Sequence, residues 1–444
     1  MNSTSILAEL DLYIKRHELG VRQFAEKLGL NAGTISHILN GTRKLTIDQL
    51  DRITEILGFS KGYFYTNYIH EYLVESTPNW RRIRPFLFKC AELEKLDCIR
   101  EIVSFLLDNL MYSPLLFEAA EELFHAGKHE AAEILYLNVA ESERKQHSER
   151  LALCQYRLFT IRIGKDQIQN FKTACQFEPY VERLDEIQQL DALKDLCNIY
   201  RSLRQWDRME ILAREMERKA KIHYFAVPRS ERKIQELQKK LSRPLFVYIA
   251  YPNLLYAAAF EGRGDYEQSL QFTYEYADLS WVKETDERTL HWLKLFKDWS
   301  QANIYTNKLL SGDLDVLEDY VLYVKDRPDE ILTALSNIVY TADRYHIDVD
   351  HIIRQFEAQI ESYEHPQTND FYKGQVIPSG FSEFLHKLAL YYLRKGDYTN
   401  GFKYMRNGMD YYVNINKLLL ANMAMLNQYN SVLEPSFLEA LPER

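Results

Sequence analysis

Residues 24–44 read FAEKLGLNAGTISHILNGTRK, and this stretch decides the fold of the first part of the chain. Apolar residues recur at helical spacing on both sides of Gly29, and Asn31 is a residue type that caps the start of a helix. The pattern predicts a short helix from Val21, a turn at the glycine, and a second helix over 32–39. The apolar residues are Phe24, Ala25 and Leu28 before the turn and Ile35, Ile38 and Leu39 after it.

Two short helices that cross steeply need a small side chain at their contact and a residue that tolerates positive φ at the corner. Ala25 and Gly29 meet these two needs. Asn40 and Gly41 are expected to end the second helix, and Thr46 to cap a further amphipathic helix. Residues 1–68 are therefore predicted to form a small helical bundle.

This segment resembles the Xre or lambda-repressor type of helix-turn-helix DNA-binding domain. The resemblance implies that the helix over 32–39 enters the major groove of a double-stranded DNA operator. Short residues at Ala32 and Gly33, and Val21 where many such domains have glutamine, favour readout of DNA shape beside base contacts. The implied base-edge residues are Asn31, Thr34 and His37, and the implied phosphate anchors are Arg22, Asn40, Thr42, Arg43 and Lys44.

The composition predicts an all-α protein, because 16 glycines and 12 prolines in 444 residues leave little turn material for a β fold. The five cysteines form no CxxC pair, so we expect free thiols, no metal and no cofactor. We find no secretion signal and no membrane-length apolar run, which predicts a cytoplasmic protein. The net charge is −9, yet residues 1–68 hold eight Lys or Arg against seven acidic residues, so DNA contact must be local.

Beyond the bundle, a turn pattern with a central glycine recurs in 126–135, 263–272, 311–320 and 395–404. Weaker copies lie around Gly164 and in 203–212. In the four main copies a helix is expected to end at the glycine and a partner helix to start, with a small residue where the two pack. The preceding stretch 69–86 is predicted as a linker helix in which Arg81, Arg82 and Arg84 are more typical of a solvated face than of DNA contacts.

The recurring turn resembles the tetratricopeptide repeat, so residues 87–444 are expected to form a right-handed α-solenoid with a concave groove and a dimerisation surface. Several first helices of the pairs carry an asparagine near a tyrosine, and an asparagine amide can hold both the C=O and the N–H of a bound peptide. The alternative is that these asparagines are ordinary surface residues and the tyrosines are core. The candidate peptide-binding residues are Asn198, Arg201, Asn253, Tyr256, Asn303, Tyr305 and Asn337.

The order of modules resembles the RRNPP group of peptide-pheromone receptors of Gram-positive bacteria. That resemblance implies a homodimeric transcription regulator of quorum sensing, in which a short signalling peptide binds the groove and shifts two DNA-binding heads. Motifs of hydrolases, metalloproteases and nucleotide-binding enzymes are absent from the sequence, so we expect no enzyme. The competing interpretation is a repeat scaffold for a protein partner, such as a phosphorelay component, with the N-terminal domain as an adaptor.

Overall fold

The structure, a computed structural model, describes residues 5–409 except 75–77, 108, 147, 165, 226–240 and 364–372. Over these residues it consists of helices and contains no β-strand, which confirms the all-α prediction of an N-terminal bundle followed by a helical repeat region. The chain divides into two compact units, Met1–Ile199 and Tyr200–Arg444. None of the described helices combines the length and apolarity needed to cross a bilayer.

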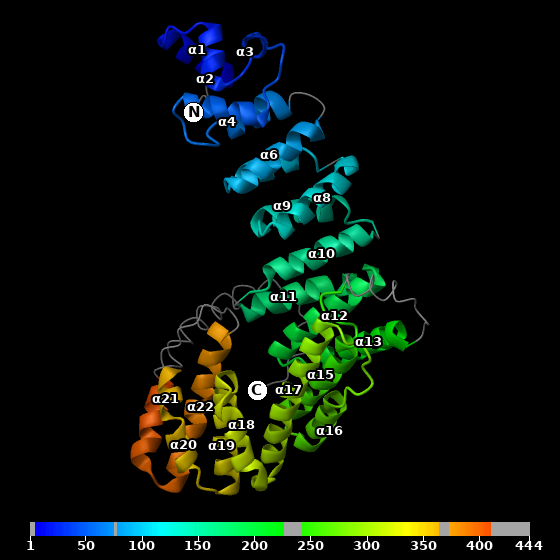
Figure 1. Cartoon of the computed structure of the whole chain (residues 1–444), viewed down its shortest axis with the longest axis vertical. Coiled ribbons are helices and arrows are strands. Elements are labelled where there is room, and N and C mark those ends of the chain that lie inside the picture. Colours follow the sequence, from blue (N-terminus) through cyan, green and yellow to red (C-terminus); the bar gives the residue numbers. More distant parts are fainter. Residues whose placement is uncertain are drawn as a thin grey trace, which may run out of the picture. The chain divides into compact units, whose positions relative to one another are not determined.

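The first unit begins with the predicted bundle (Figure 1). Its second and third helices have the bounds that the sequence suggested, and Ser5 and Thr46 cap the first and fourth helices through their side-chain oxygens. The elements are α1 (Ile6–Arg16), α2 (Val21–Leu28), α3 (Ala32–Leu39), α4 (Ile47–Ile56), α5 (Tyr65–Tyr68) and a π-helical turn at Ile69–Leu73.

The corner between α2 and α3 is fixed by backbone conformation and by one long-range contact. Gly29 has φ 63°, in the left-handed region that favours glycine, and ends α2. Arg52 on α4 donates through Nη1 to the carbonyl oxygen of Leu28 at 3.4 Å, so α4 holds the residue next to the corner. Asn31 then caps α3, since its Oδ1 accepts from the N–H of Gly33 at 2.8 Å. The predicted helix, turn and helix are confirmed.

The stretch predicted as a linker helix has a solvated face, with Arg81 and Arg84 exposed, and an opposite face that is packed. Helix α6 (Trp80–Glu92) buries Phe86, whose ring centroid lies 5.3 Å from that of Tyr65 and 5.7 Å from that of Tyr68. Pro85 lies inside α6. A single hydrophobic core therefore continues from the bundle into the first repeat helices.

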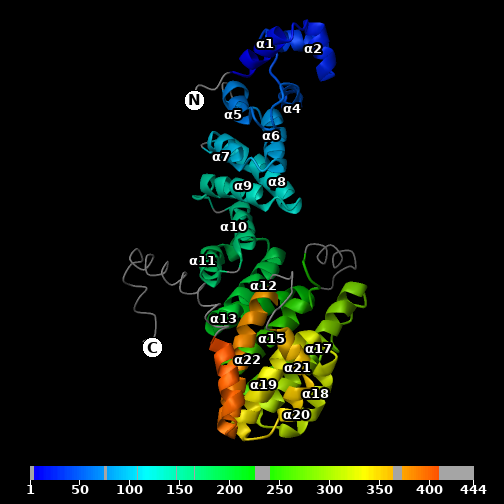
Figure 2. The ribbon, with the colours of Figure 1, turned by 90° about the vertical axis from the view of Figure 1, so that its left-hand side faces the viewer.

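After α6 the first unit is a succession of antiparallel helices (Figures 1 and 2). Partly buried polar contacts join alternate helices of this succession. The guanidinium of Arg157 donates to both oxygens of Glu121 at 2.8 Å, and Tyr156 donates to Asp195 at 2.7 Å. The helices are α7 (Leu96–Ser104), α8 (Ser113–His125), α9 (His129–Ser142), α10 (Glu149–Arg162), α11 (Gln167–Phe177) and α12 (Glu186–Ser202), with 3₁₀ turns at Leu110–Tyr112 and Glu178–Arg183.

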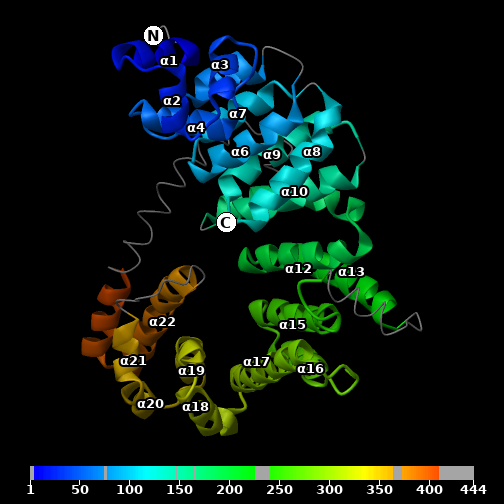
Figure 3. The same ribbon diagram turned by 45° about the horizontal axis from the view of Figure 1, so that its top comes forward.

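The second unit is also built of helical hairpins. In Figure 3, helices α15, α17, α19 and α22 follow one another on the inner side of an arc, and α16, α18, α20 and α21 lie outside it. The helices are α13 (Trp206–Phe225), α15 (Val247–Gly262), α16 (Tyr266–Ala277), α17 (Glu287–Ser311), α18 (Leu317–Lys325), α19 (Pro328–Tyr345), α20 (Asp350–Gln355), α21 (Glu357–Ser362) and α22 (Lys373–Lys395), with a 3₁₀ turn at Leu314–Val316 and a further helix over 398–409.

Most hairpin turns contain one residue in the left-handed conformation. The sequence identified the glycines at these turns, and Gly127, Gly264, Gly312 and Gly396 all have positive φ. It missed two turns in which another residue type takes the same conformation, those at Glu94 and His346. In the weaker copy at 203–212, which the sequence did indicate, Arg204 takes this conformation. The turns at Glu94 and His346 also show a repeat period that the glycines alone do not show. Glu94 precedes Gly127 by 33 residues, and His346 follows Gly312 by 34.

The turns at Glu94 and Gly127 allow a reciprocal exchange. A left-handed conformation costs a residue with a Cβ roughly 1–2 kcal/mol relative to glycine, part of which the chain entropy of glycine offsets. We expect Glu94→Gly to raise the midpoint of thermal unfolding by about 2–4 °C and Gly127→Glu to lower it by a similar amount. A Cβ at Gly127 would meet no atom within 4 Å, so the loss would be conformational and not steric. Differential scanning fluorimetry measures both.

Glu94→Ala is the matched control, because it removes the same charge and keeps the Cβ. Its unfolding midpoint is expected to stay near that of the parent protein. Equal stabilisation by alanine and glycine would show that charge, and not backbone strain, governs this turn.

Candidate nucleic-acid interface and ligand face

Helix α3 presents a polar outer face because its apolar residues are anchored in the bundle core. Ile35 and Ile38 are buried, whereas Gly33, Ser36 and His37 are exposed. Thr34 is half-buried at the edge of this face. Ser36 is a residue that the sequence prediction left out, although its spacing of three from Gly33 and four from Asn40 places it on the exposed side.

His37 and Thr42 form a small hydrogen-bonded unit at the end of α3. The Thr42 hydroxyl donates to the carbonyl oxygen of His37 at 3.0 Å, and the same oxygen of Thr42 lies 3.0 Å from Nδ1 of His37. Since that hydroxyl proton is already used, Nδ1–H must be the donor in the second bond. Neutral His37 therefore carries its proton on Nδ1 and leaves Nε2 as an acceptor on an exposed side chain.

The loop after α3 turns back along the helix. Arg43 donates through Nη1 to the hydroxyl oxygen of Thr34 at 3.3 Å, so these two predicted residues are neighbours. Asn40 is the exposed cap of α3, and Lys44 is half-buried. Arg22 is exposed in the first turn of α2, which packs beside α3.

Two buried tyrosines hold residues that follow this loop in the chain. Tyr68 donates its hydroxyl to the carbonyl oxygen of Leu45 at 2.9 Å, and burial raises the pKa of Tyr68 to about 12. Tyr65 donates to Asp51 at 3.0 Å, and burial raises the pKa of the Asp51 carboxyl although this bond opposes the shift. The basic loop is thus attached to the core of the first unit.

In the second unit, two of the predicted asparagines link successive helices. Asn303 on α17 donates through Nδ2 to the Tyr276 hydroxyl at 2.7 Å. Asn337 on α19 hydrogen-bonds with the Tyr320 hydroxyl, which also lies 2.9 Å from the hydroxyl of Thr306. One N–H of the Asn303 amide is engaged inside the protein, which leaves the second N–H and Oδ1 for a ligand.

The other predicted ligand residues are more scattered. Tyr305 is half-buried, with its ring stacked on Tyr320 at a centroid distance of 5.7 Å. Tyr256 is 9% exposed and packs against Phe272, which makes it a core residue. Asn253 lines a separate hollow of about 540 Å³ between α13 and α16. Asn198 is half-buried in the first unit, and Arg201 is exposed at the end of α12.

A charged group that the sequence did not suggest accompanies these residues. Burial raises the pKa of Glu261 at the end of α15, and the positive charges of Arg201 and Lys387 oppose that shift. Lys387 on α22 donates to the Ser336 hydroxyl at 2.9 Å and pairs with Glu383 at 2.8 Å. Arg201 was among the predicted residues, whereas Glu261 and Lys387 come from positions far apart in the chain, and no local pattern in the sequence indicates them.

Comparison with known proteins identifies the first module. A family model described as helix-turn-helix (HTH_3) matches residues 12–64, so this part of the chain is a helix-turn-helix DNA-binding domain. No curated protein sequence matches the chain. One similar solved structure is described as a circular tandem repeat protein with novel repeat topology and enhanced subunit contact surfaces; it is 12% identical, with 94% of this chain and 89% of that chain covered and a TM-score of 0.17.

The hydrogen bonds of His37 predict its tautomer. Nitrogen chemical shifts of ¹⁵N-histidine-labelled full-length protein at pH 8 are expected to show His37 protonated on Nδ1, because Thr42 can only accept there. Thr42→Val has a similar shape but lacks the acceptor, and it should move the population towards Nε2–H. His37→Gln identifies the signal by its loss. A wild-type spectrum already dominated by Nε2–H would contradict the geometry.

Proposed function

We propose that this protein is a cytoplasmic, non-enzymatic transcription regulator that binds an operator through its helix-turn-helix domain and a short signalling peptide through its repeat region. The observation that carries the proposal is the helix-turn-helix domain, whose exposed α3 face and basic loop rest on a core shared with the first repeat helices. The tetratricopeptide and RRNPP resemblances add the peptide and the dimer to the proposal.

On DNA, α3 would lie in the major groove with Asn31, Thr34 and His37 near base edges. Oδ1 of Asn31 caps the helix, so its amide N–H is the group available to an acceptor on a base. The Nε2 acceptor of neutral His37 fits the exocyclic amino group of adenine or cytosine, which are the donors in the major groove. Arg43 and Lys44 would contact phosphates, with Arg22, Asn40 and Thr42 completing the anchors.

A dimer follows from the mode of binding. Helix-turn-helix proteins reach specificity by reading two half-sites one helical turn of DNA, about 34 Å, or multiples of that apart. A ligand that prefers one arrangement of the repeats would then change the separation of the two heads and thereby the affinity for DNA. Because the head and the first repeat helices share one core, movement of those helices is expected to move α3 with them.

The proposed peptide site is the surface of the second unit around Asn303, Tyr305 and Asn337. With one N–H of Asn303 held by Tyr276, Oδ1 would accept from a peptide N–H, and the second N–H of the amide would donate to a peptide C=O. Arg201, Lys387 and Glu261 offer charges of both signs for the ends or side chains of a peptide.

Mutation of the basic loop tests DNA binding. In gel shifts with a pool of genomic fragments that includes DNA upstream of the protein's own gene, we expect salt-sensitive binding. The double substitution Arg43→Ala and Lys44→Ala should weaken it on all fragments and reduce the slope of log K against log salt by about 2, since each lost phosphate contact contributes about 0.9.

Arg144→Ala with Lys145→Ala is the control, because this adjacent basic pair follows α9, away from the helix-turn-helix domain, and the change in charge is the same. It should leave binding unchanged. Absence of wild-type binding at low salt would reject the regulator and favour a scaffold with an adaptor domain.

A pair of substitutions at Asn303 tests the peptide site. Affinity selection from a synthetic library of random heptapeptides is expected to yield binders, whose affinities fluorescence anisotropy measures. Asn303→Asp keeps an Oδ1 acceptor and should retain the part of the binding that depends on it. Asn303→Leu removes the acceptor and should weaken binding at least about tenfold, or about 1.4 kcal/mol.

Thermal unfolding of both variants controls for folding, because leucine leaves the Tyr276 hydroxyl without its amide partner. Equal affinities of the aspartate and leucine variants would contradict the proposed contact. Failure to select any peptide, together with recovery of a folded protein partner, would favour the scaffold.

A further inference from the structure

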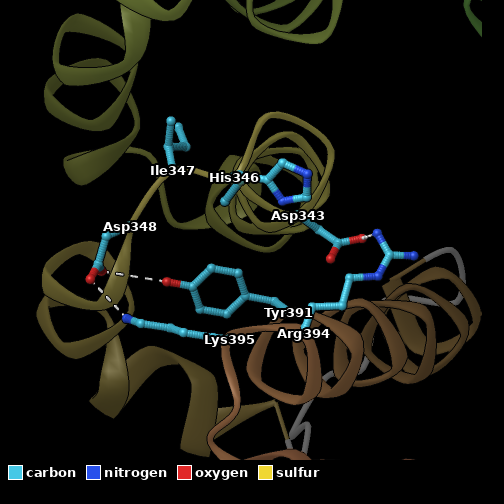
Figure 4. A pocket seen from close by; sticks show the side chains of 8 residues that line it. Asp343, His346, Ile347, Asp348, Tyr391, Arg394 and Lys395 are labelled. Atoms are coloured by element: carbon cyan, nitrogen blue, oxygen red, sulfur yellow. Dashed lines mark hydrogen bonds and ion pairs between the residues drawn. The ribbon is translucent and has the colours of Figure 1, made fainter.

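A hollow of about 200 Å³ lies between the C-terminal ends of α19 and α22 and the residues 346–348 that follow α19. It is a feature of the second unit alone, and the DNA-binding and peptide-binding proposals do not use it. Figure 4 shows two ion pairs on opposite sides, with the Tyr391 ring between them. The pairs differ in how fully their polar atoms are engaged.

The pair between Lys395 and Asp348 is saturated. Lys395 Nζ lies 2.8 Å from Asp348 Oδ2 and also binds Asp350. Tyr391 donates its hydroxyl to Asp350 Oδ1 at 2.9 Å and accepts from the N–H of Val349 at 3.1 Å. These contacts close one wall of the hollow and fix the Tyr391 ring.

The ion pair between Arg394 and Asp343 leaves hydrogen-bonding atoms of both side chains without a partner among the described residues. Arg394 Nη1 donates to Asp343 Oδ2 at 2.7 Å, which is the one hydrogen bond that the guanidinium makes within the described part of the chain. Asp343 Oδ1 is buried and has no hydrogen-bond donor within the described part of the chain. The Asp343 side chain is 15% exposed and that of Arg394 58%, so a buried acceptor adjoins accessible guanidinium donors.

A buried carboxylate oxygen without a donor is costly, so it favours a ligand that brings one. An ammonium group fits best, because the carbonyl ends of α19 and α22 add partial negative charge. The remaining N–H groups of Arg394 match a carboxylate, which guanidinium can bind with two parallel hydrogen bonds. The two halves of this ion pair are thus complementary to a zwitterion.

The geometry points to a binding site for a free α-amino acid with a small apolar side chain. Its ammonium group would donate to Asp343 Oδ1, its carboxylate would accept from Arg394, and its side chain would contact Ala342, Ile347 and the Tyr391 ring. A simple anion would face the unpaired Asp343 oxygen, and a simple amine would leave Arg394 unmatched. Each is expected to bind more weakly than the zwitterion.

The site lies near the proposed peptide face. Lys387 and Ser336, which are hydrogen-bonded to each other, precede Arg394 and Asp343 by seven residues on the same two helices, or about 10 Å along them. The end of a longer peptide is therefore the main competitor for this hollow. It carries only one of the two charged backbone groups, which separates the two ligands experimentally.

Isothermal titration calorimetry of the full-length protein with each of the common L-amino acids tests the site. Concentrations up to about 10 mM saturate even a binder with a Kd near 1 mM. We expect binding by one or more small apolar amino acids and at least about tenfold weaker binding of their N-acetyl and carboxamide derivatives. Asp343→Asn and Arg394→Gln should each weaken binding by about tenfold or more.

Glu133→Gln is the matched control, because Glu133 forms a comparable, partly buried ion pair with Arg162 at 2.7 Å in the first unit. It should bind the amino acid as the parent protein does, and thermal unfolding verifies that all variants are folded. The inference is overturned if no amino acid binds, if the blocked derivatives bind equally well, or if the two site variants retain full affinity.

Discussion

Tyr68 makes the contact on which the coupling of the two modules depends. Its ring packs against Phe86 of α6, and its hydroxyl binds the carbonyl oxygen of Leu45, directly after the basic loop that follows α3. One buried side chain thus touches both the first repeat helix and the backbone next to Arg43 and Lys44. Since breaking such a bond would leave a buried polar group unpaired, the loop and α6 are expected to move as one body.

The helix-turn-helix fold could be predicted from the sequence because its determinants are local. Gly29 sets the corner, and Asn31 and Thr46 cap helices through hydrogen bonds within three residues of themselves. The repeats were harder to predict, because not every one of their turns carries a residue type that marks it. Glycine at a turn can be seen in a sequence, whereas Glu94 and His346 take the same left-handed conformation without any residue type that signals it.

The ligand face was predicted less completely, because a residue type does not reveal its partner. The recurrence of asparagine near tyrosine in the sequence suggested a double clamp, but the tyrosine that binds Asn303 comes from the preceding helix, 27 residues earlier. For Tyr256 the alternative interpretation, that the tyrosines belong to the core, is the one that the structure supports. Donors and acceptors that pair across helices are decided by packing, which a single sequence does not encode locally.

The polar contacts between helices also affect how the stack of helices can change its arrangement. Arg157 with Glu121, Tyr276 with Asn303, and Tyr320 with Asn337 each join two helices through groups that are costly to leave unpaired. Close-packed helix interfaces resist gradual sliding, and hydrogen bonds between fixed partners restrict the possible arrangements further. A stack joined in this way has discrete arrangements, and a peptide that binds one of them better, for example through Asn303 Oδ1, would select that arrangement.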